Sequence, residues 1–527
     1  MGLIAKFASV GGATAASRVL GFAREATIAA LLGAGPVADA FYAAFRFPNL
    51  FRRLFAEGPF NAAFVPLFTK ALHGEEDESR ARELTSDIAS LLAVTLIAFS
   101  ALAMIFMPFL TATVIAPRFV DTPEKFDLTV LLARIMFPYL GAMSFAAMLT
   151  GVLNAHGRFF VAALAPTLLN VALIAGLLFA WHLGFDEPSI GIAIAVSVTV
   201  SGALQLLLLI AEMRRTGFGF SVLRRPRLTP DVRRFLALAG PAVLTGGVTQ
   251  INLVIGQIIA SAQDGAIALI NFADRIFQLP LGIIGIAIGV VLLPELSRAL
   301  RVGDDRAATA LQNRSMEFAL LLTLPAAAGL LVMPAPIVSV LFERGAFTAE
   351  TTARTAEILR SFAWGLPAFV LVKVFQPAFY AREDMTLPLY ATGANVVVNV
   401  ALSLLLFPVM GPAGIGMATS AAGWLNAGIL AIAAIGRGLL RPDRGTVRRT
   451  AAMIAGAVLM GVALWWAAGR LAAPLASSPF TLKAPLVLAL VGAAALLHFL
   501  VTFVAGGLGL SDLKAMVRRT PRAEPRG

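Results

Sequence analysis

The sequence contains no cysteine, and only four of its 527 residues are histidine. The absence of cysteine excludes disulfide bonds, thiol nucleophiles and cysteine-based metal sites. No two histidines form an HxxxH or HExxH pair, so the sequence predicts no metal site and no cofactor. Charged residues are also scarce, at 14% of the chain against roughly 25% in soluble proteins. So few charges cannot cover a folded chain of this length with polar surface, which favours lipid as the solvent.

Long apolar stretches dominate what is present. Hydrophobic residues make up 58% of the chain, and its mean hydropathy is +0.84. A membrane-crossing helix needs ~20 predominantly apolar residues, whereas a membrane β-strand alternates apolar and polar residues over ~10 positions. The stretches here are continuous, so we expect an all-α, polytopic integral membrane protein with 14 transmembrane helices. The expected spans are 8–33, 38–68, 88–116, 128–153, 160–182, 189–212, 234–261, 265–296, 314–342, 354–380, 386–407, 411–436, 449–471 and 484–508.

The distribution of basic residues predicts how the chain is oriented. With the N-terminus in the cytoplasm and residues near the ends of the spans assigned to the adjacent segment, 27 lysines and arginines fall in inside segments and 7 in outside segments. Cytoplasmic loops of membrane proteins collect lysine and arginine, so we expect a multi-pass protein of the bacterial inner membrane with both termini cytoplasmic. The same rule accounts for the net charge of +12 without nucleic acid as a partner.

Weak internal repeats divide the chain into two halves. Asn170-Val-Ala-Leu173 recurs as Asn399-Val-Ala-Leu402, and Pro138 and Pro367 are separated by the same 229 positions. We therefore expect two six-helix pseudo-repeats around a central cavity, as in transporters built from parallel repeats. The predicted parts are an N-terminal lobe (1–212), a basic cytoplasmic linker (213–233), a C-terminal lobe (234–436), two extra C-terminal helices (437–508) and a basic cytoplasmic tail (509–527).

Basic side chains inside the expected spans indicate the chemistry of the cargo. An arginine at the bilayer centre is unfavourable by ~2.5–3.5 kcal/mol on insertion scales, so such residues pair, reach the interface or face a wet cavity. We take eight basic residues and only four acidic ones to lie within the membrane. The basic residues are Arg18, Arg24, Arg46, Arg52, Arg53, Arg134, Arg275 and Lys373, and the acidic ones are Glu25, Asp39, Glu57 and Asp274. The excess predicts a positively charged cavity for an anionic group, and the planar guanidinium of arginine suits phosphate.

Spacing in the second span separates two interpretations. Asn49, Arg53 and Glu57 follow one another at intervals of four, so they share a helix face, and an Arg53–Glu57 pair would be purely structural. Arg52 points ~100° away from that face and needs a different partner. The chain has neither the GxxxxGK[ST] pattern of nucleotide hydrolysis nor the GxSxG pattern of serine hydrolases. It therefore reads as a secondary-type transporter and not an enzyme.

Several motifs resemble one known family. Ser17-Arg-Val-Leu-Gly-Phe-Ala-Arg-Glu25, Phe47-Pro-Asn-Leu-Phe-Arg-Arg-Leu-Phe-Ala-Glu-Gly58 and Ala273-Asp-Arg275 are similar to segments of the MurJ (MviN) lipid II flippases. The resemblance runs from about residue 3 to 436 and is weak in the last two spans. It implies the multidrug/oligosaccharidyl-lipid/polysaccharide exporter fold and a substrate, undecaprenyl-pyrophosphate-linked disaccharide-pentapeptide, moved from the inner to the outer leaflet for peptidoglycan synthesis.

The resemblance also implies roles for particular residues. Arg18, Arg24, Arg52 and Arg275 match cavity arginines linked to function in the family, and Asp39 matches an acid linked to it. Together with Asn49, Arg53 and Glu57 they form the predicted substrate site, and the two extra C-terminal helices are similar to a pair that forms a groove for the lipid tail. Lipid II and membrane lipids are the expected partners, with cell-wall synthesis proteins as further candidates.

The residues leave other functions open. A flippase for another polyprenyl-linked glycan, such as an O-antigen or capsule repeat, would need the same pyrophosphate contacts. A cation-coupled drug exporter would need acids in its cavity, which the excess of basic residues opposes. A non-transporting scaffold for wall synthesis is the alternative from a different class of protein. Sodium coupling is disfavoured because the seventh, eleventh and twelfth spans contain no Asp or Glu to bind the ion.

Overall fold

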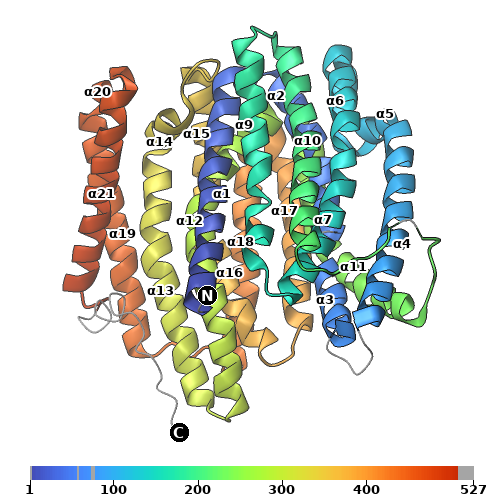
Figure 1. Ribbon diagram of the computed structural model, residues 1–527. Helices are drawn as coiled ribbons and strands as arrows, with labels where there is room; N and C mark the ends of the chain where they lie inside the picture. The colour runs from blue at the N-terminus through green and yellow to red at the C-terminus, as the bar shows by residue number, and fades with distance from the viewer. Residues whose placement is uncertain (1–2, 56–58, 73–77, 223, 509–527) are drawn as a thin grey trace. The chain divides into compact units, whose positions relative to one another are not determined.

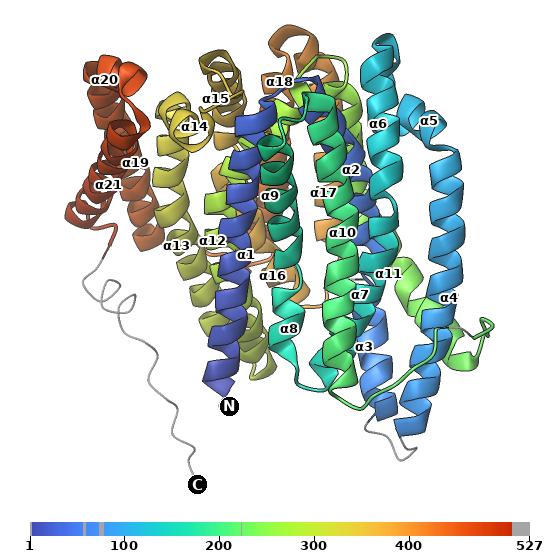
Figure 2. The ribbon, with the colours of Figure 1, turned by 45° about the horizontal axis from the view of Figure 1, so that its top comes forward.

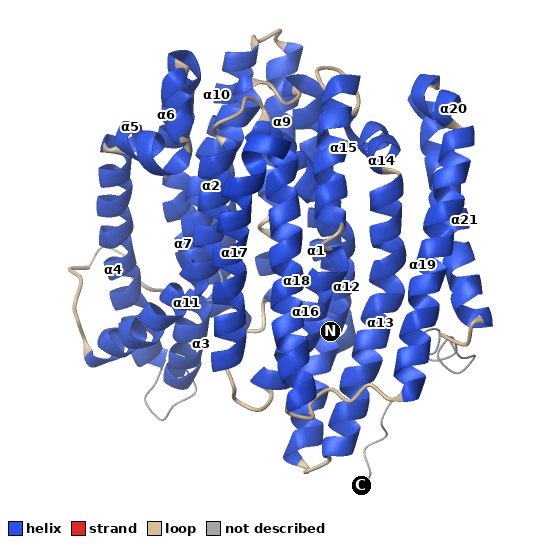
Figure 3. Cartoon of the chain, turned by 180° about the vertical axis from the view of Figure 1, so that it is seen from behind, coloured by secondary structure: helices blue, strands red, loops and turns tan. Residues whose placement is uncertain are grey.

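A computed structural model describes residues 3–55, 59–72, 78–222 and 224–508. Within these ranges the chain is built from helices and short connections and contains no strand (Figure 3). This confirms the prediction of an all-α protein. The structure forms two compact units, which we describe separately. Unit 1 comprises residues 1–271 and 344–351, and unit 2 comprises residues 272–343 and 352–527.

Unit 1 holds the first eleven α-helices and the start of the twelfth. They are α1 (Leu3–Leu32), α2 (Pro36–Phe55), α3 (Pro59–Leu72), α4 (Glu78–Ile105), α5 (Met107–Leu110), α6 (Pro123–Met136), α7 (Pro138–Ala155), α8 (Phe159–Leu164), α9 (Thr167–His182), α10 (Glu187–Arg214) and α11 (Pro230–Ala260). A π-helix (Thr111–Ile115) and a 3-10 helix (Pro117–Asp121) join α5 to α6. Within the unit α1 packs along α9 (Figure 1) and α8, and α2 packs against α6.

Unit 2 takes most of α12 and the helices that follow. They are α12 (Ala266–Arg301), α13 (Asp305–Val332), α14 (Pro334–Phe342), α15 (Ala349–Ala363), α16 (Leu366–Tyr380), α17 (Thr386–Met410), α18 (Pro412–Gly436), α19 (Arg444–Arg470), α20 (Ala472–Ser477) and α21 (Phe480–Val504). In this unit α17 pairs with α18, and α19 pairs with α21 (Figure 2).

Eleven helical segments of the described chain are long and apolar enough to cross a membrane. Shorter apolar helices lie within α3 and α11, at Ala63–Leu72 and Gln250–Ala260. Each of the 14 predicted windows coincides with one or more helices, but α1, α2 and α11 fall outside the eleven. The number 14 therefore stays a prediction, as does the grouping of the helices into two lobes around a cavity.

Apolar side chains on the outside of several helices fit a lipid surrounding. Along α17 only 11% of the apolar window is buried, and Leu405 and Val409 are 69% and 84% exposed. At the far end of α19, Trp465 and Trp466 are also exposed. Large exposed apolar surfaces are unfavourable in water, and tryptophan favours the interface between membrane and water. Both observations follow if lipid covers these helices.

The fourth predicted span of each half is interrupted at the matching proline. Pro138 is the first residue of α7, directly after α6 ends at Met136. Pro367 is the second residue of α16, after α15 ends at Ala363. Proline lacks an N–H group and fits the first turn of a helix, where that group has no partner within the helix. The two halves therefore share a local feature at positions 229 apart.

The predicted linker lies between α10 and α11 and is anchored to unit 1. Phe218 is buried, and its ring centroid lies 5.5 Å from that of Phe68 and 5.4 Å from that of His156. Arg82 of α4 donates a hydrogen bond to the carbonyl of Gly217 (3.2 Å). The basic side chains farther along the linker, at residues 224, 225 and 227, are exposed. An aromatic anchor thus holds a segment whose charges face outward.

Candidate functional site

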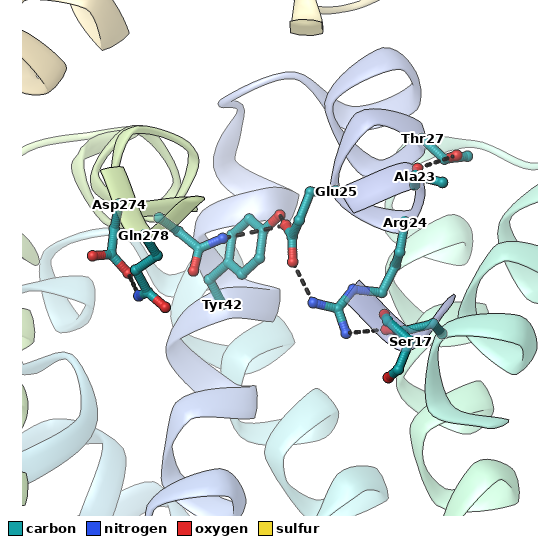
Figure 4. A network of polar contacts seen from close by, with 10 residues as sticks. Ser17, Ala23, Arg24, Glu25, Thr27, Tyr42, Asp274 and Gln278 are labelled. Atoms are coloured by element: carbon teal, nitrogen blue, oxygen red, sulfur yellow. Dashed lines mark hydrogen bonds and ion pairs between the residues drawn. The ribbon is translucent and has the colours of Figure 1, made fainter. Parts of the chain in front are cut away.

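Arg24 of α1 is buried in unit 1 and is paired. One end of its guanidinium forms an ion pair with the adjacent Glu25, and Nη1 donates to Oδ1 of Asn170 on α9 (3.0 Å). Asn170 in turn donates through Nδ2 to the carbonyl of Ser17 (3.0 Å). Figure 4 shows the guanidinium directed at the Glu25 carboxylate. A simple count of residues suggests that Arg24 contributes an uncompensated positive charge. In the structure, Glu25 compensates that charge.

Glu25 is the centre of this network. Its Oε2 atom accepts hydrogen bonds from the hydroxyl of Tyr42 on α2 (2.6 Å) and from Nδ2 of Asn271 on α12 (3.3 Å). With Arg24 on Oε1, the carboxylate is held by donors from three helices (Figure 4). A buried carboxylate needs such partners because its desolvation is otherwise strongly unfavourable. Tyr42, Asn170 and Asn271 were not predicted as site residues. They are far apart in the sequence, so no local pattern indicates that they come together.

Asp39, in the first turn of α2, is fully buried, and both of its carboxylate oxygens accept hydrogen bonds from the protein. Its Oδ2 atom accepts hydrogen bonds from Lys125 Nζ (2.8 Å) and from the backbone N–H of Gly265 (2.7 Å). Its Oδ1 atom accepts from the backbone N–H of Ala268 (2.9 Å). Gly265 directly precedes α12, so Asp39 caps the N-terminus of that helix, where a negative charge is favourable. These contacts engage both carboxylate oxygens and fit a positioning role for Asp39.

Lys125 is a further residue that sequence reasoning missed. The sequence places it in a short outer loop, whereas the structure places it in the first turn of α6, with a side chain that is only 2% exposed. Its ammonium also contacts Asp264 Oδ1 (2.9 Å) and lies 4.0 Å from the ring centroid of Phe119. Pro123 could have indicated that a helix begins here and includes Lys125, because proline is frequent at the first position of a helix.

The remaining predicted site residues are distributed over both units. Arg18 of α1 and Arg53 of α2 are exposed, and Asn49 of α2 is half-buried. Arg275 is half-buried on α12 in unit 2. Beside it, Asp274 accepts a hydrogen bond from Gln278 Nε2 (Figure 4). The side chain of Arg52 and all of Glu57 lie outside the described residues. A single cavity lined by these arginines therefore stays a prediction.

Unit 2 contains an apolar cavity of about 350 Å³. It is lined by residues of α12, α13, α14, α19 and α21. Its walls are aliphatic and aromatic side chains and helix backbone, among them Leu322, Met460, Val491 and Phe499. A cavity with such walls suits a hydrocarbon chain better than a sugar or a phosphate. Two of the helices that line it, α19 and α21, are the C-terminal pair for which the family resemblance implies a lipid-tail groove.

Acidic clusters that could hold a metal are lacking in the described part of the chain. No group of three or more His, Asp or Glu residues is placed there to bind an ion. On α11, Gln257 donates from Nε2 to the carbonyls of Ala43 (3.3 Å) and Ile115 (2.7 Å). This amide of the seventh predicted span thus ties α11 to neighbouring backbone.

Comparison with known proteins gives matches along almost the whole chain. Residues 28–484 match the family model described as "Lipid II flippase MurJ". A protein of Rhizobium meliloti described as "Probable lipid II flippase MurJ" is 49% identical over 522 residues, which is 98% of this chain and 97% of that protein. A "Lipid II flippase MurJ" of Burkholderia cenocepacia is 34% identical over 474 residues, covering 89% of this chain and 90% of that protein.

Solved structures show the same fold. A lipid II flippase MurJ in an inward closed conformation aligns with a TM-score of 0.77 at 23% identity, covering 97% of this chain and 99% of that chain. An inward-facing multidrug resistance transporter of the MATE family and MOP superfamily aligns with a TM-score of 0.66 at 15% identity, covering 80% of this chain and 95% of that chain. These similarities confirm the fold class expected from the sequence.

Proposed function

This chain belongs to the MurJ family of lipid II flippases, and we propose that it moves lipid II from the inner to the outer leaflet of the bacterial inner membrane. The observation that carries this function is the 49% identity to a protein described as a probable lipid II flippase, extending over 98% of the chain. The many helices fit to span a membrane agree with it. Both termini would be cytoplasmic, in keeping with the bias of basic residues.

Membership of this family makes the chain a transporter and not a hydrolase. Without a nucleotide-binding pattern, the membrane potential is the natural energy source, since it supplies ~2.3 kcal/mol per charge per 100 mV. An anionic head group that crosses from the negative inner side to the outer side moves down this potential. The direction of transport needed for wall synthesis is therefore the favourable one.

Alternating access gives the arginines a role in this cycle. In the proposed mechanism the pyrophosphate of lipid II binds Arg18, Arg24, Arg52 and Arg275, whose forked donors match phosphate oxygens. Arg24 forms an ion pair with Glu25 in the present structure. The pyrophosphate of the cargo would therefore displace the Glu25 carboxylate from the Arg24 guanidinium. Exchange of one anion for another avoids leaving a buried arginine uncompensated. It also lets the cargo depart, since Glu25 can take the guanidinium back.

The lipid tail would remain in apolar surroundings. We propose that the cavity between α13, α19 and α21 holds part of the polyprenyl chain while the head group moves. Its apolar lining, with Leu322, Met460 and Phe499, supports this assignment. The sugars and peptide require a wet passage, which these walls do not offer.

Complementation tests the proposed function. The chain is expressed in a bacterium whose own lipid II flippase can be switched off, together with Ala substitutions at Arg18, Arg24, Arg52 and Arg275. We expect the wild type to restore growth and the four variants to fail at normal membrane levels, with lipid II accumulating in the inner leaflet. Arg301→Ala, at an exposed position near the end of α12, is the matched control and should restore growth. A wild type that inserts but does not restore growth would instead favour another polyprenyl-linked cargo.

A further inference from the structure

Lys125 lies at a junction of three segments that are distant in sequence. Its Nζ atom is 2.8 Å from Asp39 Oδ2 and 2.9 Å from Asp264 Oδ1, and the ring of Phe119 covers it at 4.0 Å. Asp39 comes from α2, Asp264 from the loop before α12, and Phe119 from the 3-10 helix before α6. The lysine side chain is 2% exposed and Asp39 is 0% exposed, whereas Asp264 is 84% exposed. The Lys125–Asp39 pair is thus the buried part of the junction.

The Asp39 carboxylate supplies a cap that α12 cannot supply itself. A helix begins with backbone N–H groups that have no partner within the helix, and a side-chain oxygen at the preceding position usually accepts from them. The preceding position of α12 is Gly265, which has no side chain. The carboxylate of Asp39 on α2 takes the place of the missing cap and accepts hydrogen bonds from the N–H groups of Gly265 and Ala268. The cap is charged, and Lys125 is the cation that lets this charge stay buried.

Backbone contacts leave the junction no room to rearrange locally. Gly265, Gly33 and Gly345 all have positive φ angles, of 76°, 56° and 58°. A Cβ atom on Gly265 would lie 2.7 Å from the carbonyl oxygen of Ala34, and one on Gly345 would lie 2.1 Å from that of Ala30. Only glycine provides both the conformation and the space. The turn between α1 and α2 is therefore packed directly against the backbone of the other two loops.

The chain passes between the two units within α12 and at both ends of residues 344–351. The start of α12 belongs to unit 1 and its continuation from Phe272 to unit 2, and residues 344–351 belong to unit 1 while the chain on either side belongs to unit 2. Arg275 lies on the same continuous helix as the capped start of α12. Nine residues separate Ala266 from Arg275, which is ~14 Å along the helix axis.

We propose that Lys125 is a positioning residue of the flippase, which keeps Asp39 as the cap of α12 and so fixes the helix that presents Arg275 to the cargo. This inference rests on the proposed function. Lys125 does not itself contact the cargo, because two carboxylates and an aromatic ring surround its ammonium. It follows that Asp39 also acts through α12, although the family resemblance assigns it to the substrate site.

A charge-balanced double variant tests whether Lys125 acts through Asp39. Lys125→Met leaves the buried Asp39 carboxylate without its cation, and we expect loss of complementation. Adding Asp39→Asn removes that charge and retains a carbonyl oxygen that can accept from the N–H of Ala268, so the double variant should regain growth. A direct role of either charge in binding the cargo predicts instead that the double variant is as inactive as Lys125→Met, which would overturn the proposal.

Hydrogen exchange measures the cap without any cargo. In purified protein we expect Lys125→Met to accelerate amide exchange over residues 265–269, and the double variant to restore the slow rate. Lys70→Met, at an exposed lysine in the last turn of α3, is the matched control and should leave this segment unchanged. Unchanged exchange in Lys125→Met would refute the cap. This readout stands even if the chain carries a different cargo, so failure of the proposed function is recognised separately by the wild-type complementation.

A mutant cycle with Arg275 separates positioning from a general loss of folding. If Lys125 acts through Arg275, Lys125→Met should weaken lipid II binding about tenfold in the wild-type background and less than about twofold in the Arg275→Ala background. Binding is measured with purified variants in nanodiscs at matched protein levels. Equal losses in the two backgrounds would show that Lys125 serves stability alone.

Discussion

Arg24 and Glu25 are neighbours in sequence, yet their side chains form a buried ion pair within α1. Adjacent residues on a helix point about 100° apart, so they seldom face each other. Here both long side chains turn toward the same space, and Asn170, Tyr42 and Asn271 fix them there. The candidate anion site of unit 1 is therefore already occupied by an internal anion.

Removing the Glu25 charge tests the exchange of anions. Glu25→Gln should leave Arg24 without a competing carboxylate, and we expect lipid II to bind more tightly, by about tenfold, while turnover falls because release slows. Binding is measured in nanodiscs and turnover in proteoliposomes. Glu350→Gln, at an exposed acid on α15, should change neither. Weaker binding in Glu25→Gln would mean that Glu25 chiefly holds Arg24 in place.

Two glycines with similar backbone angles should differ in their tolerance of alanine. Gly345 has φ of 58° and a carbonyl oxygen 2.1 Å from its would-be Cβ, whereas Gly303 has φ of 75° and nothing within 4 Å. We expect Gly345→Ala to lower the free energy of unfolding by about 3 kcal/mol and Gly303→Ala by about 1 kcal/mol. Thermal unfolding in detergent compares them. Equal losses would show that the contact with Ala30 relaxes without strain.

Filling the apolar cavity of unit 2 should affect only long lipid tails. Ala326 of α13 lines the cavity, and Ala326→Phe would occupy the space proposed for the polyprenyl chain. We expect the variant to lose affinity for lipid II about tenfold and to bind a short-tailed analogue as the wild type does. Ala310→Phe, at an exposed position of the same helix, is the control. A parallel loss for both ligands would place the tail elsewhere.

The loop between α16 and α17 should respond to acid. A hydrogen bond from Arg437 holds the pKa of the Asp384 carboxyl below its ordinary value of 3.8. A lowered pKa in the folded state stabilises the fold above the unfolded value, and this contribution is lost as the pH falls through the lowered one. Asp384→Asn should therefore unfold at a lower temperature than the wild type near neutral pH, and the difference should shrink as the pH falls below 3.8 and vanish below the lowered pKa. Glu383→Gln is the control, and a difference that persists in acid would contradict the assignment.

Much of the fold follows from the sequence alone. Continuous apolar stretches predict helices in lipid because a bilayer offers no partner for unsatisfied backbone groups. The prolines at 138 and 367 are recognised in the sequence only as part of the repeat, and the predicted spans run through both. The structure starts a helix at each of them, because proline cannot donate a hydrogen bond within a helix. The motifs around Arg24 and Arg52 identify the family, which the comparisons confirm.

The burial of the charged side chains and the identity of their partners could be learned only from the tertiary structure. The contacts of Asp39 join residues 86 and 229 positions apart, and Arg24 meets Asn170 across 146 positions. No local pattern carries such information, because helix spacing relates only residues three or four apart. The sequence by itself determined an all-α membrane transporter of a known family and predicted which charges enter the membrane. Only the folded chain decided which of those charges are neutralised within the protein, since neutralisation depends on which helices pack together.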